Sequence, residues 1–591
     1  MYTLGISAYF HDSAAALTHE NKLIYAVQEE RFSRKKNDNS FPKFAIQNIL
    51  ESNKLDLNKI NNIVFYEKPF IKFERLIETY LRFAPYGFSS FKKSIPVWLK
   101  EKLMMKRTLI KELNLLEKNN NYEEKIKFSD HHLSHAASTY FLSNFDEALI
   151  VTMDAVGEWT TTSIMIGKEY KIEFKEEINF PHSLGLLYSA FTYFCGFEVN
   201  SGEYKLMGLA PYGKSKYKDL ILNELINIKE DGSFNLNQNY FDYCTGLRMT
   251  NKKFETLFKV KPRELGSKFI DEIYIDLAAS IQDVLELCII KLLKHFKQKY
   301  KINNLCLAGG VSLNCAANGK IYREKIFDKI FITPASGDAG GAAGAALAYD
   351  FSINKPMKKV SYENKEISYL GTLYNDKQIE DFLVLNNIKF QKLTYDEITT
   401  FVSEKISKNK IIGWFQGRME FGPRALGARS ILADPRTNNM QEDINFKIKF
   451  REGFRPFAPI VLNDYVDEWF ECDEESPFML NLYQLKKEKI LNSDLVNKAK
   501  LFNKLKIKKS EIPAVTHVNF TSRLQTLKKD DNKILYDLIS KFYKITNIPI
   551  LVNTSFNING EPIVESVEDA YKCFQTTNLD YLVLENFLIE K

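Results

Sequence analysis

Short apolar runs separated by polar turns open the chain. Residues 1–8, 14–18 and 22–28 are mainly apolar, and a polar stretch with His11 and Asp12 separates the first two runs. Runs of this length between polar turns predict three strands joined as hairpins. Side chains on the first turn are well placed for acid–base chemistry, so His11 and Asp12 are candidate catalytic residues. The alternative is an Asx turn that only shapes the hairpin.

The same pattern returns later in the chain. An apolar run from Ala148 ends at Asp154, before a turn that contains Gly157, and residues 160–166 and 170–178 are predicted as the strands that follow. An acid at a strand end before a glycine turn can approach a phosphate or a metal ion. Two such halves predict an α/β fold with an internal duplication.

Three of the eight histidines lie together, at His131, His132 and His135. His131 and His135 are spaced i, i+4, which places them on one face of a helix, where two imidazoles can hold one metal ion. His132 points elsewhere and is expected to be structural. The alternative is a polar helix start whose histidines are solvated.

Two glycine-rich junctions follow predicted strands. Gly309 and Gly310 permit a close backbone approach to a ligand, and the helix expected to begin near Asn314 favours a phosphate group. Asp338 stands at the start of a helix rich in Ala and Gly. Its carboxylate could reach a ligand or a metal, or it could serve only as an N-cap.

Two lysines of the N-terminal half are also candidates. Lys36 ends a mixed-charge run that begins at Glu29, and Lys205 lies in a stretch shaped by Gly and Pro. Either side chain could meet an anionic ligand or an acceptor. The alternative for both is a solvated surface.

Positive charge gathers around Gly, Pro and aromatic residues in the C-terminal half. The arginine fork matches phosphate oxygens, and charge embedded in apolar sequence needs a partner, so a polyanionic small ligand is favoured over RNA or a solvated basic face. Polar side chains at two later predicted strands complete the set. The candidates are Arg424, Arg429, Lys449, Arg455, Arg523, Asn553 and Ser555.

A chain of 591 residues exceeds a single core and predicts several domain-sized units. We place one domain at 1–351, with a largely helical insertion over about 42–125. A polar segment without a clear period, 352–368, is predicted as a linker, and 369–591 as the second domain.

Composition narrows the function classes. The net charge is +6, and basic residues alternate with acidic or apolar ones, so no nucleic-acid partner is expected. Seven cysteines are scattered without a C-x-x-C pair, which favours reduced thiols and a cytoplasmic protein. Neither a signal region nor a run long enough to span a membrane is present.

Taken in order, these motifs resemble the carbamoyltransferases typified by NodU and TobZ. The resemblance covers essentially the whole chain and is most specific in FGPRALG, FRPFAP and NTSFN. It rests on His11-Asp12-Ser13, His131-x-x-x-His135, Asp154, Gly309-Gly310-x-x-Leu313-Asn314, Ser336-Gly337-Asp338 and these three C-terminal segments. Ala155 is a departure, because the family usually has Gly at that position.

The resemblance implies a TsaD-like domain of the duplicated actin-like (ASKHA) class, followed by a YrdC-like α/β domain. It implies a metal on His131, His135 and Asp338, ferrous iron with zinc as the alternative. It assigns catalysis to His11, Asp12 and Lys205, and acceptor binding to Lys36. By motif position, the contacts that it implies for the nucleotide and carbamoyl phosphate are Arg424, Lys449, Arg455, Arg523, Asn553 and Ser555. From the patterns above, we also assign Asp154, Gly309, Gly310, Asn314 and Arg429 to the binding of ATP and carbamoyladenylate.

The activity that the resemblance implies is ATP-dependent O-carbamoyl transfer. Carbamoyl phosphate and ATP, with Mg²⁺, would give carbamoyladenylate, whose carbamoyl group would pass to a hydroxyl of a sugar or sugar-like acceptor. The chain could pair as a homodimer. Two rivals stay open: an enzyme that makes threonylcarbamoyladenosine on tRNA, and a non-catalytic actin-like protein that binds a nucleotide or sugar.

Overall fold

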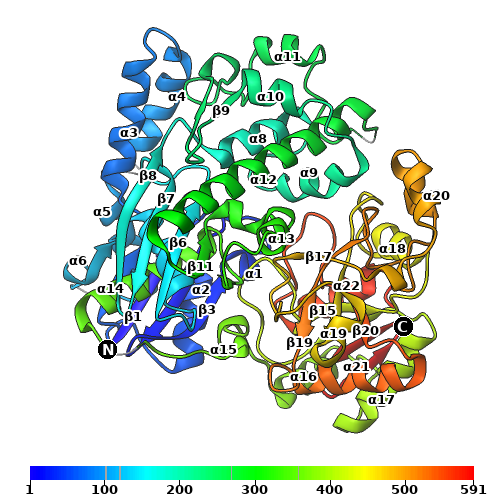
Figure 1. The fold of residues 1–591 in the computed structure, drawn as a ribbon. Coiled ribbons are helices and arrows are strands. Elements are labelled where there is room, and N and C mark those ends of the chain that lie inside the picture. Colours follow the sequence, from blue (N-terminus) through cyan, green and yellow to red (C-terminus); the bar gives the residue numbers. More distant parts are fainter. Residues whose placement is uncertain (100–102, 119–120, 268, 357–358) are drawn as a thin grey trace. The chain divides into compact units, whose positions relative to one another are not determined.

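The computed structural model describes residues 1–99, 103–118, 121–267, 269–356 and 359–591. The chain forms two compact units (Figure 1). The first comprises Met1–Glu29 and Asn39–Tyr362, and the second comprises Glu30–Asp38 and Glu363–Lys591. The boundary after Tyr362 falls inside the segment expected to be a linker, of which residues 357 and 358 lie outside the described part. The sequence did not predict that Glu30–Asp38 belongs to the second unit.

The first unit begins with a five-stranded sheet in the order β3-β2-β1-β4-β5. The three N-terminal strands are antiparallel neighbours, and β4 and β5 continue from β1 in parallel. The strands are β1 (Tyr2–Ser7), β2 (Ala14–His19), β3 (Lys22–Gln28), β4 (Asn62–Phe65) and β5 (Ile126–Phe128).

A second five-stranded sheet repeats this plan in the order β8-β7-β6-β11-β12. Again three successive strands form an antiparallel meander, and two later strands add in parallel beside the first of them. The strands are β6 (Glu147–Met153), β7 (Thr160–Lys168), β8 (Lys171–Asn179), β11 (Asn304–Ala308) and β12 (Lys329–Ile332). The shared plan confirms the predicted α/β fold with an internal duplication.

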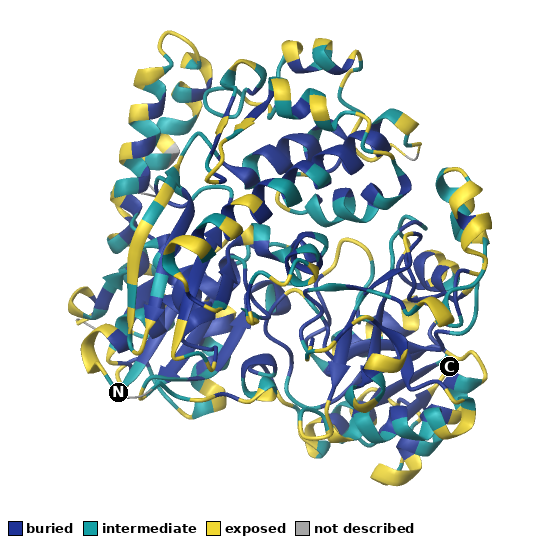
Figure 2. Cartoon of the chain, viewed as in Figure 1, coloured by how far each residue is buried: buried dark blue, intermediate teal, exposed yellow. Residues whose placement is uncertain are grey.

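Helices α7 (His131–Tyr140) and α14 (Asp338–Asn354) pack against each other, and both also contact strands. Gly344 allows this close crossing, because a Cβ there would overlap the carbonyl group of Ser134 on α7. The run of small residues in α14 is therefore a packing surface. Most residues of both helices are buried. Figure 2 shows buried strands in the interior of the unit.

In its described residues, the segment expected to be a largely helical insertion contains five helices and one short strand of the first sheet. These residues are largely helical, and the short strand β4 within the segment was not expected; residues 100–102 and 119–120 lie outside the description. Its helices are α2 (Lys43–Asn53), α3 (Pro69–Arg82), α4 (Phe88–Trp98), α5 (Met105–Leu116) and α6 (Tyr122–Lys125). Helices further along this unit are α8 (Leu184–Phe194), α9 (Glu203–Leu209), α10 (Lys218–Glu224), α11 (Lys252–Phe258), α12 (Glu272–Tyr300) and α13 (Cys315–Arg323).

The second unit is built on an eight-stranded mixed sheet in the order β13-β22-β21-β14-β15-β20-β16-β19. Its strands are β13 (Gln391–Lys392), β14 (Ile412–Phe415), β15 (Arg429–Ala433), β16 (Ala458–Leu462), β19 (Gln525–Leu527), β20 (Ile550–Ser555), β21 (Tyr581–Leu584) and β22 (Phe587–Glu590). The longer helices are α16 (Asp376–Leu385), α17 (Tyr395–Ser407), α21 (Lys533–Thr546) and α22 (Val567–Thr576).

Across the described ranges of both units, no helix combines the length and the apolar character that a membrane crossing requires.

Candidate functional site

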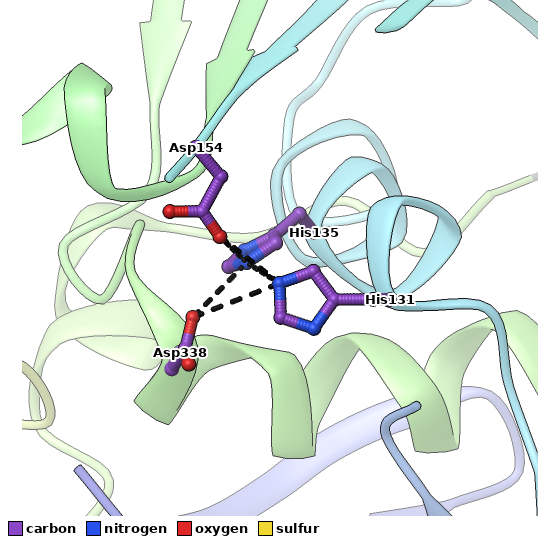
Figure 3. A group of neighbouring side chains, drawn as sticks. All are labelled: His131, His135, Asp154 and Asp338. Atoms are coloured by element: carbon purple, nitrogen blue, oxygen red, sulfur yellow. Dashed lines mark hydrogen bonds and ion pairs between the residues drawn. The ribbon is translucent and has the colours of Figure 1, made fainter. Parts of the chain in front are cut away.

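Four described side chains of the first unit converge on one point: His131, His135, Asp154 and Asp338 (Figure 3). One ligand atom from each lies within 4.8 Å of the others. The His131 Nε2 atom is 3.0 Å from Asp154 Oδ2, and His135 Nε2 is 3.3 Å from Asp338 Oδ1. The structure thus brings together the three predicted metal ligands and adds Asp154, which we had assigned to the nucleotide.

Local structure explains why these groups meet. The two histidines lie one turn apart on α7, and Asp154 directly follows β6. Asp338 is the first residue of α14, where the helix dipole stabilises a carboxylate. Because α7 packs on α14, the imidazoles and this carboxylate come together from distant parts of the sequence.

The glycine junction supports the same centre. Gly309 has φ of +86°, which favours glycine, and the Gly310 amide donates to Asp154 Oδ1 at 3.4 Å. Asn314, the other predicted contact here, makes hydrogen bonds within the protein. Its side chain caps α13 at the Ala317 amide and exchanges hydrogen bonds with Gln282.

All four side chains are buried. Although burial opposes the charged ring, hydrogen bonds to Asp154 and Asp338 raise the pKa of His135 to about 9. Burial also opposes ionisation of Asp154, yet hydrogen bonds from His131 and His135 hold its pKa well below the usual value. Two imidazoles and two carboxylates are a nitrogen and oxygen donor set that suits Fe²⁺ or Zn²⁺, so the residues present fit a metal ion.

His11 stands beside this cluster. Its Nδ1 atom is 3.1 Å from Asp12 Oδ2, and its Nε2 atom is 3.7 Å from Asp338 Oδ2. Burial opposes the charged form, but Asp338 and Asp12 raise the pKa of His11 to about 10. Asp12 has φ of +51°, a left-handed turn conformation that aspartate adopts more readily than most residues. Lys205 lies on α9 (Glu203–Leu209).

A cluster of cations marks the second unit. The Lys449 side chain is buried, and its Nζ atom donates to the carbonyl oxygen and the hydroxyl of Ser555 and to Asn557 Oδ1. Burial, with Arg451, Arg455 and Lys36 nearby, lowers the pKa of Lys449 well below its usual value. The groups that Lys449 contacts are neutral, so this cationic cluster suits a polyanion that neutralises it.

Lys36 reaches this region on the N-terminal segment Glu30–Asp38. Arg31 donates to the carbonyl of Gly422 at 2.8 Å, and Arg34 donates to those of Pro562 and Ile563 at 2.9 and 2.7 Å. Two arginines thus tie the segment to the second unit. The structure places Lys36 within the electrostatic surroundings of Lys449, whereas we had assigned it to the acceptor.

Glu420 organises the FGPRALG loop and was missed in the sequence. One of its carboxylate oxygens accepts hydrogen bonds from the amides of Leu426, Ala428 and Arg429 at 2.8, 2.7 and 3.1 Å. Three amides on one oxygen fix the loop that carries Arg424. The sequence feature that could have indicated this role is the position of Glu420 as an acidic residue within a basic, glycine-rich run.

Arg429 makes hydrogen bonds to main-chain carbonyls. Its side chain is fully buried, and Nη1 donates to the carbonyls of Gln416, Gly417 and Ala428. The guanidinium also stacks 3.5 Å from the centre of the Phe415 ring. Main-chain carbonyls thus occupy the Nη1 donors of Arg429, whereas its buried Nε has no partner among the described residues. These contacts hold the loop around Arg429 together, and its assignment to ATP binding stays a prediction.

The remaining predicted residues line neighbouring strands and loops. Asn553, on β20, is fully buried and donates to Gln525 Oε1 at 2.8 Å, while its Oδ1 atom finds no hydrogen-bond partner among the described residues. A buried acceptor left open in this way can receive a ligand donor. Arg523 ends β18 (Thr521–Arg523), and Arg455 pairs with Glu452 at 3.5 Å.

The fold and the two centres define a class: an α/β protein with a buried histidine–carboxylate cluster in one unit and a cationic cluster in the other. Residues 2–347 match the family described as Carbamoyltransferase N-terminus, and residues 403–591 match Carbamoyltransferase C-terminus. The chain therefore belongs to the carbamoyltransferase family and is a carbamoyltransferase, which confirms the resemblance seen in its motifs.

Relatives extend over most of the chain. The uncharacterized protein sll1178 of Synechocystis sp. is 49% identical and aligns over 100% of this chain and 97% of its own length. Nodulation protein NolNO of Sinorhizobium fredii is 36% identical over 99% of this chain and 80% of its own length. Nodulation protein NolO of Bradyrhizobium diazoefficiens is 35% identical over 78% of this chain and 79% of its own length.

Proposed function

We propose that this carbamoyltransferase makes carbamoyladenylate from ATP and carbamoyl phosphate in its second unit. Its first unit then transfers the carbamoyl group to a hydroxyl of a sugar or sugar-like acceptor. The observation that carries the proposal is the buried Lys449, whose contacts are neutral and whose charged neighbours Lys36, Arg451 and Arg455 are all cations. Such a centre favours a ligand with several negative charges, as ATP and carbamoyl phosphate both are.

The first reaction needs charge stabilisation. Water releases phosphate from carbamoyl phosphate and leaves carbamate, an oxygen of which attacks the α-phosphorus of ATP. The bond to pyrophosphate breaks, and pyrophosphate leaves. Mg²⁺, when bound with ATP, would neutralise part of its charge. The phosphate oxygens would be held by Lys449, Arg424, Arg455 and Arg523. Cations that are already in place stabilise the negative charge that develops on these oxygens in the transition state. Asn553 offers a buried acceptor to the carbamoyl amide.

The second reaction belongs to the first unit. His131, His135, Asp154 and Asp338 would hold ferrous iron, with zinc as the alternative. When bound, such an ion supplies a Lewis acid that polarises a carbonyl or phosphoryl oxygen. His11, oriented by Asp12, offers an N–H to negative charge that develops beside Asp338. The acceptor oxygen forms a bond to the carbamoyl carbon as the bond to AMP breaks, and the hydroxyl proton leaves with solvent.

Resemblance to the NodU and TobZ type supports a sugar-like acceptor. The burial of the four-residue cluster supports transfer away from bulk water. Water would otherwise hydrolyse carbamoyladenylate, which is a reactive mixed anhydride.

The full-length protein tests the proposal directly. Pyrophosphate release is measured with ATP alone, with carbamoyl phosphate alone and with both, and acceptor sugars are then screened for the mass gain of one carbamoyl group. We expect pyrophosphate only when both substrates are present. Absence of pyrophosphate under all three conditions would overturn the adenylate route, and pyrophosphate without any carbamoylated sugar would overturn the acceptor class.

A further inference from the structure

Helix α3 of the insertion turns its charged face inward. Its buried residues include Lys72 and Arg75, whereas Phe70 and Leu81 on the same helix are 65% and 71% exposed. An amphipathic helix normally buries its apolar stripe. A helix that buries cations must meet acceptors inside the protein, because an unpaired buried charge is costly.

The acceptor for Lys72 is Glu67. The Nζ atom lies 2.6 Å from Glu67 Oε2, and the two side chains are 7% and 0% exposed. The ammonium also lies 4.8 Å from the centre of the Phe10 ring. Arg75 makes a second inward contact and donates to the carbonyl of Gly157 at 2.8 Å. Both contacts attach α3 to the surroundings of the four-residue cluster, since Gly157 lies three residues after Asp154.

The Glu67 carboxylate also faces a cluster residue. Its Oε2 atom lies 3.9 Å from Nδ1 of His131. That Nδ1 atom is buried and has no hydrogen-bond partner among the residues that the structure describes. The other ring nitrogen of His131, Nε2, faces Asp154. One nitrogen therefore points into the cluster, and the other points at Glu67.

We propose that Glu67, held in place by Lys72, is a positioning residue that orients His131 for metal binding. A histidine that binds a metal through one nitrogen commonly donates its other N–H to a carboxylate, which fixes the ring and raises its basicity. The Glu67 carboxylate lies on the side of the His131 ring where such a partner would stand, 3.9 Å from Nδ1. Helix α3 thereby links the insertion to the transfer centre. The inference rests on the metal site of the proposed function.

Metal affinity of the full-length protein tests this role. Co²⁺ is the probe, because its visible absorption reports the ligand geometry, and affinity is measured by competition with a chelator. The variant Glu67→Gln keeps the shape of the side chain but leaves Lys72 without its counter-charge. The double variant E67Q/K72M removes both charges, so it leaves no unpaired buried charge that would destabilise the fold. Glu74→Gln, on the exposed side of α3, is the matched control.

We expect E67Q/K72M to bind Co²⁺ about 10–100-fold more weakly than the wild type, with an altered visible spectrum. The Glu74→Gln variant should match the wild type in both. Equal affinity and an equal spectrum for E67Q/K72M would overturn the positioning role while leaving the metal site intact. A wild type that binds no Co²⁺, Fe²⁺ or Zn²⁺ would instead overturn the metal site itself.

Discussion

The Nε2 atom of His135 lies 3.3 Å from Oδ1 of Asp338. The histidine belongs to the helix that follows the first sheet, and the aspartate begins the helix that follows the second. Each half of the duplicated fold therefore contributes a part of one centre. The contact depends on how closely α7 and α14 pack, so the geometry of the cluster is coupled to the core of the unit.

The first prediction separates the two reactions. The variant Asp338→Asn removes one carboxylate from the cluster, and His131→Ala removes one imidazole. Both should abolish carbamoyl transfer and bound metal while pyrophosphate release from ATP and carbamoyl phosphate continues, because the cations of the second unit are unchanged. Metal content by elemental analysis and a pyrophosphate assay measure the two effects. Equal loss of both activities would refute the division of labour between the units.

The cluster shows how far the sequence could lead. Spacing on one helix was enough to pair His131 with His135. The position of Asp154 at a strand end indicated that it contacts a phosphate or a metal ion. The sequence does not show that Asp154 lies in the same cluster as the histidines. Its position depends on the pairing of β6 with β11 and on the glycine junction at Gly309 and Gly310.

Other elements were hidden for related reasons. Strand β4 is a four-residue run inside a segment of charged helices, and its identity comes from pairing with β1. Glu67 carries no local signal of His131, which lies on another element, and Glu420 differs from its surroundings only as an acidic residue in a basic run. The basic run around Arg429 was recognisable, but only burial distinguishes a phosphate contact from an arginine that binds main-chain carbonyls.

The second prediction concerns Lys449. Changing it to Met should lower the rate of pyrophosphate release by about 10²–10³-fold, the usual cost of removing one preorganised group that stabilises developing charge. Transfer from chemically supplied carbamoyladenylate should persist, because the first unit is intact. Lys447→Met is the control, since that side chain is 58% exposed and pairs with Asp443. A Lys449→Met variant with the wild-type rate would remove Lys449 from the adenylation site.

The third prediction tests the coupling between packing and the cluster. The variant Gly344→Val places a side chain against the carbonyl of Ser134, so α14 must move away from α7. Overpacking of this kind costs about 1–3 kcal/mol of stability. We expect a lower melting temperature and weaker metal binding, because Asp338 moves with its helix. Ser352→Ala, at the exposed end of α14, should change neither property. Unchanged metal affinity in Gly344→Val would show that the cluster tolerates a shift of the helix.

The fourth prediction concerns pH and Glu474 of the second unit. Burial raises the pKa of Glu474 from 4.5 to about 7, although its Oε1 atom accepts a hydrogen bond from the Tyr483 hydroxyl at 3.0 Å. Between these two values the folded chain keeps a proton that the unfolded chain releases, so stability falls as pH rises through this window, by at most about 3 kcal/mol. Glu474→Gln should therefore melt higher than the wild type at pH 8 and equally at pH 4. The exposed Glu471→Gln should match the wild type at both. Parallel melting curves of Glu474→Gln and the wild type across this range would contradict the raised pKa.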